Sequence, residues 1–196
     1  MIVIIHRVNS IKKLKKIKYK FGVEIDIRSE KNKLYLSHDA FKLGTNFEKW
    51  LKYYKHKFIV LNVKEEGLET KILKALKKYK INKFFFHDQT FSSMLKIMKK
   101  TKVSIRISEY EEIKNKRRLF KYIKWVWIDH FTKFPLNIKQ LKQIKKFNIK
   151  FCIVSPELVK RRYKKKILKL KKYLHKNNFH IDAVCTKYPS LWSRQN

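Results

Sequence analysis

The chain has 196 residues, of which 44% are hydrophobic and 14% aromatic, and it carries a formal net charge of +36. This apolar content excludes a disordered polycation, and no apolar run approaches the ~18 residues that a membrane span needs. The lysines are spread over most of the predicted helices, which favours a solvated basic surface over a nucleic-acid site. We therefore expect faster encounter with small anionic substrates and no stable nucleic-acid partner.

Short apolar runs alternate with lysine-rich segments of helical period. Alternating or β-branched runs predict strands at residues 2–7, 22–28 with an extension over 33–39, 57–64, 82–88, 102–108, 122–131, 149–158 and 180–189. Apolar residues at helical spacing predict helices at residues 11–19, 46–55, 69–79, 91–100, 111–120, 138–147 and 162–177. The predicted N-cap residues are Ser10, Asn46, Thr90 and Asn137.

Eight alternations of strand and helix predict an α/β protein. One unit per roughly 24 residues is the rhythm of a compact (β/α)₈ TIM barrel, with a last helix reduced to the segment SLWSRQ. An open doubly wound sheet is the alternative, but no glycine-rich phosphate loop follows the first strand. Composition does not shift along the chain, so we expect one domain over residues 1–196 without an insertion domain.

Two cysteines, Cys152 and Cys185, each lie in an apolar run. They are expected to be buried free thiols and not a disulfide or a metal pair. A cytoplasmic protein without a transmembrane segment is therefore expected. The strong positive charge leaves a peripheral contact with an anionic membrane open.

Polar side chains gather where the predicted strands end. Glu24 and Asp26 are two residues apart in an apolar run, so they point to the same side of a strand. Two uncompensated buried carboxylates would be costly, and a bound cation would offset that cost. With His38 shortly after them, this pattern is typical of a metal-assisted catalytic site.

The order of these motifs resembles the glycerophosphodiester phosphodiesterases, in the superfamily of phospholipase C-like phosphodiesterases. The family's first strand ends in His-Arg-Gly, and IIHRVNS has His6 and Arg7 but Val8 in place of the glycine. The family's second strand carries Glu-x-Asp, which VEIDIR matches with Glu24 and Asp26. This part of the resemblance implies that the ends of the first two strands belong to the site.

The resemblance continues through the next two segments and to the end of the chain. LYLSHDAF matches the family's His-Asp with His38 and Asp39. VLNVKEEG keeps the lysine of Glu-x-Lys as Lys64 but has Asn62 in place of the metal-binding glutamate. The segment IDAVCTKYPSLW is similar to the family's closing segment. Asn62 offers a carbonyl oxygen without charge, so metal should bind more weakly here.

The resemblance implies metal-dependent hydrolysis of a phosphodiester, with a role for each matched residue. The weakly bound ion is expected to be Mg²⁺ or Ca²⁺. The implied residues are Glu24, Asp26 and Asn62 for the metal, Arg7 and Lys64 for the substrate phosphate, and His6 and His38 for proton transfer.

Other polar residues at strand ends have less specific interpretations. Trp127 and Asp129 share one face of their strand, and both are candidates for lining the pocket. Arg106 is a third candidate, which binds a substrate anion or pairs with Glu109. At the end of the strand at 82–88, His87 and Asp88 are either a second polar pair at the barrel mouth or loop-capping residues, and we favour loop capping.

Three functions stay open at this point. The first is hydrolysis of a glycerophosphodiester. The second is hydrolysis of a sugar- or polyol-phosphodiester of the cell envelope. The third is a catalytically weak barrel that binds phosphate ligands and has lost a metal-binding carboxylate at Asn62.

Overall fold

The computed structural model describes residues 1–159 and 163–193. It divides into two compact units, one formed by residues 4–103 and the other by residues 1–3 together with residues 104–196. The predicted start of a helix at Arg162 and the end of the segment SLWSRQ lie outside the described residues. That the whole chain is a single domain stays a prediction.

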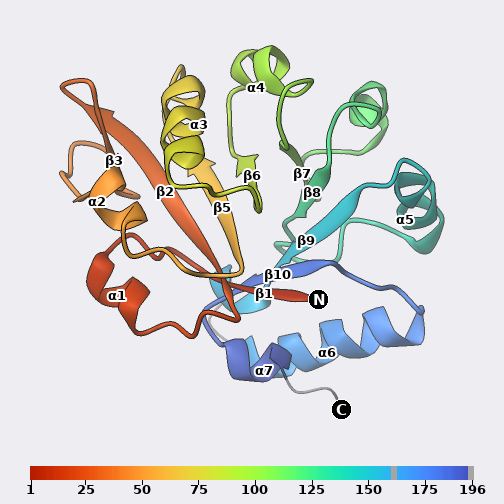
Figure 1. Cartoon of the computed structure of the whole chain (residues 1–196). Coiled ribbons are helices and arrows are strands. Elements are labelled where there is room, and N and C mark those ends of the chain that lie inside the picture. Colours follow the sequence, from red (N-terminus) through yellow and green to blue (C-terminus); the bar gives the residue numbers. More distant parts are fainter. Residues whose placement is uncertain (160–162, 194–196) are drawn as a thin grey trace. The chain divides into compact units, whose positions relative to one another are not determined.

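The N-terminal unit is built on parallel strands. Its sheet runs from the end of β1 (Ile2–Ile5) through β2 (Gly22–Glu30) and β5 (Phe58–Val63) to β6 (Phe84–His87), each parallel to its neighbour. The connecting helices are α1 (Ile11–Lys15), α2 (Phe47–Leu51), α3 (Glu69–Lys78) and α4 (Phe91–Ile97), coloured from red to yellow-green in Figure 1. Since parallel strands all point the same way, the residues at their carboxyl ends share one edge of this sheet.

A hairpin replaces the predicted extension of the second strand. Residues 33–39 do not continue β2, because the chain reverses at Lys31 and Asn32, whose φ angles are +44° and +67°. Positive φ at both central residues is the geometry of a tight two-residue hairpin turn. The following strand β3 (Lys33–Leu36) is antiparallel to β2, and the short β4 (Thr45–Asn46) is antiparallel to β3. The reversal returns His38 toward the level of Asp26, whose carbonyl accepts the Ser37 N–H at 3.1 Å.

The C-terminal unit also has parallel strands. They are β7 (Ser104–Ile107), β8 (Trp125–Ile128), β9 (Lys150–Val154) and β10 (Ala183–Thr186). Its α-helices are α5 (Ile138–Lys145), α6 (Tyr163–Lys176) and the short α7 (Pro189–Ser193), and η2 (Pro156–Leu158) is a 3₁₀ turn. The cysteines Cys152 and Cys185 are buried and free, as predicted.

The α-helix predicted at 111–120 is wrong. The structure has a 3₁₀ helix there, η1 (Lys114–Leu119), and it buries none of its residues. An α-helix in a protein is stabilised mainly by packing an apolar face. The run KNKRRL has Leu119 as its only large apolar residue and contains four cations. The sequence pattern was therefore too polar to support a regular α-helix.

All four predicted N-caps are confirmed. The side chains of Ser10, Asn46, Thr90 and Asn137 each accept a hydrogen bond from the backbone N–H three residues on. At Asn137 the bond is reciprocal, because the Gln140 side chain accepts the backbone N–H of Asn137 at 2.9 Å. This capping box satisfies two backbone donors that the helix itself cannot pair.

Replacing Asn137 with alanine should destabilise the protein. We expect Asn137→Ala to lower the free energy of unfolding by about 1 kcal/mol, since the N-cap hydrogen bond to the first turn of α5 is lost. Urea unfolding of the variant measures the change. Lys139→Ala, an exposed change on the same helix, is the matched control and should stay close to wild type. Equal stability of the two variants would contradict the assignment of Asn137 as a stabilising cap.

Candidate active site

Strand β2 carries two buried carboxylates on one face. Glu24 is 1% exposed and Asp26 is fully buried. In the parallel register with β5, Glu24 lies opposite Val60 and Asp26 lies opposite Asn62. The alternation expected from the sequence therefore places Asn62 on the neighbouring strand beside the two acids.

The Glu24 carboxylate is bound by residues from the first strand and from β5. Its Oε2 accepts the backbone N–H of Arg7 at 2.7 Å and lies 3.9 Å from His6 Nε2. Its Oε1 accepts a hydrogen bond from Asn62 Nδ2 at 3.1 Å. Arg7 has a φ of +52°, a conformation that costs a non-glycine residue about 1–3 kcal/mol. This strained backbone turns the Arg7 amide toward Glu24.

Asp26 is held by an asparagine that the sequence analysis did not single out. Asn9 donates from Nδ2 to Asp26 Oδ2 at 2.8 Å and accepts the Asp26 backbone N–H at 2.9 Å. Asn9 follows His6 and Arg7 by two to three residues, so the short motif after the first strand also supplies this support. The second Asp26 oxygen, Oδ1, lies 3.6 Å from Lys64 Nζ.

Lys64 joins two acidic residues. Besides its approach to Asp26, its ammonium group donates to Asp88 Oδ2 at 3.0 Å. The sequence left Asp88 as a loop-capping residue or as part of a polar pair at the barrel mouth, and the structure pairs its carboxylate with Lys64. Glu65, the next residue, accepts hydrogen bonds from Ser29 and Arg28 instead. Lys64 is therefore a cation that Asp26 and Asp88 share.

Arg7, His38 and Asp39 form a hydrogen-bonded chain at the surface of the cluster. Arg7 Nη2 lies 2.5 Å from His38 Nε2, and His38 Nδ1 lies 2.8 Å from Asp39 Oδ1. Because a guanidinium group only donates, Nε2 is the acceptor in this contact. Nδ1 faces the Asp39 carboxylate, which fixes the ring. The hydrogen bond from His38, followed by that from Lys42, lowers the pKa of Asp39 to about 2.

Burial, and next the nearby charge of Asp26, raises the pKa of Glu24 to about 7 from the ordinary 4.5. Between these two values the folded protein holds a proton that the unfolded chain has released. The Glu24 contribution to stability should therefore be complete below pH 4.5 and be lost as pH rises to about 7. Denaturant unfolding in chelator from pH 5 to 8 measures this loss, and Glu24→Gln should lack it. Identical pH slopes in both proteins would contradict a raised pKa.

The oxygen atoms of this cluster fit a hard divalent cation. Asp26 Oδ1 and Asn62 Oδ1 are buried acceptors that no hydrogen bond within the described residues satisfies. Carboxylate and amide oxygens are the ligands that Mg²⁺ and Ca²⁺ prefer. In the part of the chain that the structure describes, no three His, Cys, Asp or Glu residues form a metal-binding group. The candidate set is thus two carboxylates and one amide.

The three other residues predicted near a pocket lie in the C-terminal unit. Arg106 Nε is 3.1 Å from Asp129 Oδ2, and Trp127 Nε1 donates to Asp129 Oδ1 at 3.3 Å. Asp129 is thus a common partner of the other two, and Arg106 has an ion-pair partner other than the predicted Glu109. Their role in lining a substrate pocket stays a prediction.

Comparison with known proteins identifies the fold. No family model matches the sequence, and a sequence search of curated proteins finds no match. Among solved structures, a glycerophosphodiester phosphodiesterase from Thermotoga maritima is similar at 21% identity with a TM-score of 0.70, over 97% of this chain and 96% of that one. A phosphodiesterase from Oleispira antarctica, in complex with the product sn-glycerol-3-phosphate, is 17% identical with a TM-score of 0.70, over 98% and 96%.

A third similar structure is a glycerophosphoryl diester phosphodiesterase from Parabacteroides distasonis. It is 11% identical with a TM-score of 0.66, over 97% of this chain and 84% of that one. The chain therefore has the α/β fold of the glycerophosphodiester phosphodiesterases over nearly its whole length. The predicted (β/α)₈ fold class is confirmed at this level. Among the described residues, no helix is long and apolar enough to cross a bilayer.

Proposed function

We propose that this chain, with the fold of the glycerophosphodiester phosphodiesterases, hydrolyses a phosphodiester of the glycerophosphodiester type. The observation that carries the proposal is the cluster within the N-terminal unit. There the carboxylates of Glu24 and Asp26 are buried beside Lys64, and Arg7 connects Glu24 to His38. The fold similarity supports the same reaction, as does the product bound in one of the similar structures.

Arg7 and Lys64 are the groups that would bind the phosphoryl oxygens. Arg7 uses one nitrogen toward His38 and has further N–H donors that can contact a phosphate. Lys64 is 17% exposed and presents its charge between Asp26 and Asp88. Charge-assisted hydrogen bonds to a phosphate strengthen as negative charge develops on its oxygens in the transition state.

His38 and His6 would share the proton transfers. A phosphate bound to Arg7 lies next to His38 Nε2, the nitrogen that accepts and can therefore take a proton. Asp39 orients the ring and stabilises the imidazolium ion that results. His6 lies beside the Glu24 carboxylate. It would make the second proton transfer, at the substrate or water oxygen that His38 does not serve. In hydrolysis one histidine takes the proton of the attacking water, and the other gives a proton to the leaving alkoxide.

Glu24, Asp26 and Asn62 would hold the divalent ion, Mg²⁺ or Ca²⁺. When bound, such an ion neutralises phosphoryl oxygens and orients the nucleophile. The protein's own contribution is to keep the three oxygen donors together, through Asn9 on Asp26 and through the Arg7 amide on Glu24. We also propose that the protein is cytoplasmic.

A second function is favoured by one specific observation. Asn62 donates to Glu24 where the resemblance leads us to expect a third carboxylate, so the cluster already contains a neutral partner for the acid. A barrel that binds phosphate esters without turning them over would have this arrangement. The test also compares substrates with glycerol and with another polyol as the leaving group.

The test is a hydrolysis screen with a binding arm. Glycerophosphodiesters, polyol phosphodiesters and bis-p-nitrophenyl phosphate are incubated with the protein and Mg²⁺, Ca²⁺ or Mn²⁺, with and without chelator. We expect turnover that chelator abolishes. In the binding arm, calorimetry with glycerol 3-phosphate detects a phosphate site. Binding without any turnover would overturn hydrolysis and support the phosphate-binding barrel.

A further inference from the structure

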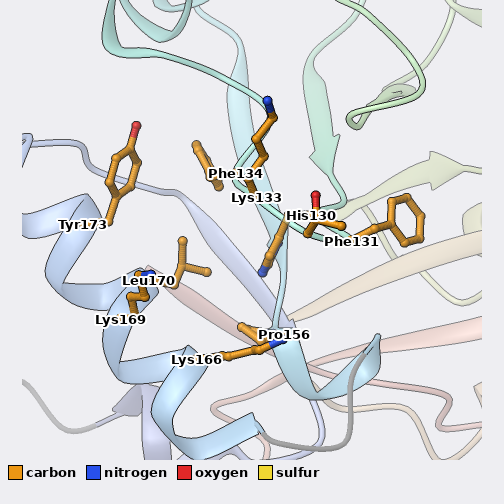
Figure 2. A pocket seen from close by; sticks show the side chains of 10 residues that line it. His130, Phe131, Lys133, Phe134, Pro156, Lys166, Lys169, Leu170 and Tyr173 are labelled. Atoms are coloured by element: carbon orange, nitrogen blue, oxygen red, sulfur yellow. The ribbon is translucent and has the colours of Figure 1, made fainter.

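A cavity of about 380 Å³ lies in the C-terminal unit. One wall is the segment His130–Phe134, which follows β8, and the other wall is helix α6 (Figure 2). Pro156, the first residue of η2, lies between them (Figure 2). The volume is at the lower end of the ~300–1,000 Å³ of pockets that bind small molecules.

The inside of the cavity is apolar. Pro156 is buried and Leu170 is 7% exposed. Phe134 bridges the two walls, since its ring centroid lies 5.7 Å from that of Tyr173 on α6 and 6.3 Å from that of His130. Aromatic and aliphatic faces of this kind remove the apolar part of a ligand from water.

Positive charge surrounds this apolar interior. Lys133 comes from the loop wall, and Lys166 and Lys169 come from α6 (Figure 2). None of the ten described residues that line the cavity is acidic. Because the three ammonium groups flank an apolar interior, the cavity suits a ligand with an apolar body and an anionic end.

The loop wall is held in place by a carboxylate outside the cavity. Glu109 accepts the backbone N–H groups of Phe131, Thr132 and Lys133 at 2.6–2.9 Å, and it also accepts the Thr132 hydroxyl at 2.8 Å. Tyr110 packs on Phe131 with ring centroids 5.5 Å apart. A wall fixed by backbone hydrogen bonds costs little ordering free energy when a ligand binds.

We propose that this cavity binds a single-chain anionic amphiphile, with its chain against Phe134, Leu170 and Tyr173 and its anionic head at the lysines of α6, Lys166 and Lys169. The head can be a carboxylate, as in a fatty acid, or a phosphate monoester, as in an alkyl phosphate. The site uses no residue of the proposed phosphodiesterase cluster and does not depend on it.

The test is calorimetric titration of the whole chain with decanoate, decyl phosphate and the neutral decyl maltoside, each below its micelle-forming concentration. We expect saturable 1:1 binding of at least one anionic probe and much weaker binding of the maltoside. Binding of only decanoate or only decyl phosphate identifies the head group. Equal binding of all three, or no saturable binding of either anion, would overturn the proposal.

Two double variants separate this site from general attraction to a basic surface. Lys166→Ala with Lys169→Ala removes two charges that line the cavity. Lys165→Ala with Lys172→Ala removes two exposed charges of the same helix that do not line it. The first pair should weaken the anionic probe roughly 5-fold or more, at about 0.5 kcal/mol for each of these exposed charges. The second pair should change it less than about 2-fold, and equal losses would show adsorption alone.

A separate variant tests the apolar contacts of the proposed site. Phe134→Ala removes the ring that bridges the two walls and should weaken decanoate and decyl phosphate alike. Circular dichroism shows whether Phe134→Ala is folded. If it is unfolded, the two lysine double variants alone test the proposed site. A folded Phe134→Ala variant with unchanged affinity would overturn the placement of the chain in this cavity.

Discussion

His38→Ala is expected to reduce the turnover of a glycerophosphodiester by about 10²-fold or more while leaving the fold intact. His38 is 40% exposed, so its removal leaves no large void in the core. Its Nε2 accepts from Arg7 and its Nδ1 faces Asp39, an arrangement suited to taking up a proton beside a bound anion. His6→Ala should lose activity to a similar extent, because His6 is the second proposed proton-transfer group.

The measurement is steady-state kinetics over a pH series. A proton-transfer residue should change kcat and remove one limb of the pH profile, whereas a residue that only binds substrate should change KM. His175→Ala, on the exposed side of α6, is the matched control and should leave the kinetics unchanged. A His38→Ala variant with normal kcat and a normal pH profile would exclude His38 from the mechanism.

Much of the local structure could be predicted because its causes are local. A period of two places Glu24 and Asp26 on one side of β2, and that side is where the structure buries them. The caps at Ser10 and Asn137 depend only on a side chain and the backbone three residues on. For these features the cause lies within a few residues of sequence and the residue types signal it clearly, so the sequence was enough.

The hairpin after β2 could not be predicted, because its turn has no strong signal. Neither glycine nor proline marks the reversal at Lys31 and Asn32, and the apolar alternation resumes directly after it. An asparagine tolerates positive φ, but one asparagine among lysines is weak evidence for a turn. Without the hairpin, the sequence predicted only that His38 lies at a strand end with the other polar residues, and its contact with Arg7 was not predicted.

The ion pair between Lys64 and Asp88 was missed for a different reason. It joins the ends of β5 and β6, so it depends on the register that sets Asn62 opposite His87. Pairing register arises from packing over the whole sheet and is not visible in either segment alone. The roles of these residues in catalysis stay predictions, whereas their convergence is a property of the structure.

Asn62→Asp is expected to tighten the binding of Mg²⁺ or Ca²⁺ by about 10-fold or more. Affinity for such ions depends on how many charged oxygens surround them, and the proposed ligand set has two carboxylates, Glu24 and Asp26. Lys64, 3.6 Å from Asp26 Oδ1, opposes the ion further. An aspartate keeps the size of Asn62 and adds the missing charge.

The same substitution should have the opposite effect on the metal-free protein. Asn62 Nδ2 donates to Glu24 Oε1 at 3.1 Å, and Asn62→Asp replaces that donor with a third acid in a buried cluster. Stability without metal should therefore fall, and added metal should restore it by more than in wild type.

Calorimetry and thermal unfolding, each with and without Mg²⁺, measure both effects independently of activity. Asn82→Asp, which makes the same charge change at an exposed position of the N-terminal unit, controls for net charge. If the metal titrations of Asn62→Asp and wild type coincide, then Asn62 is not a ligand and the cation must be sought elsewhere in the cluster.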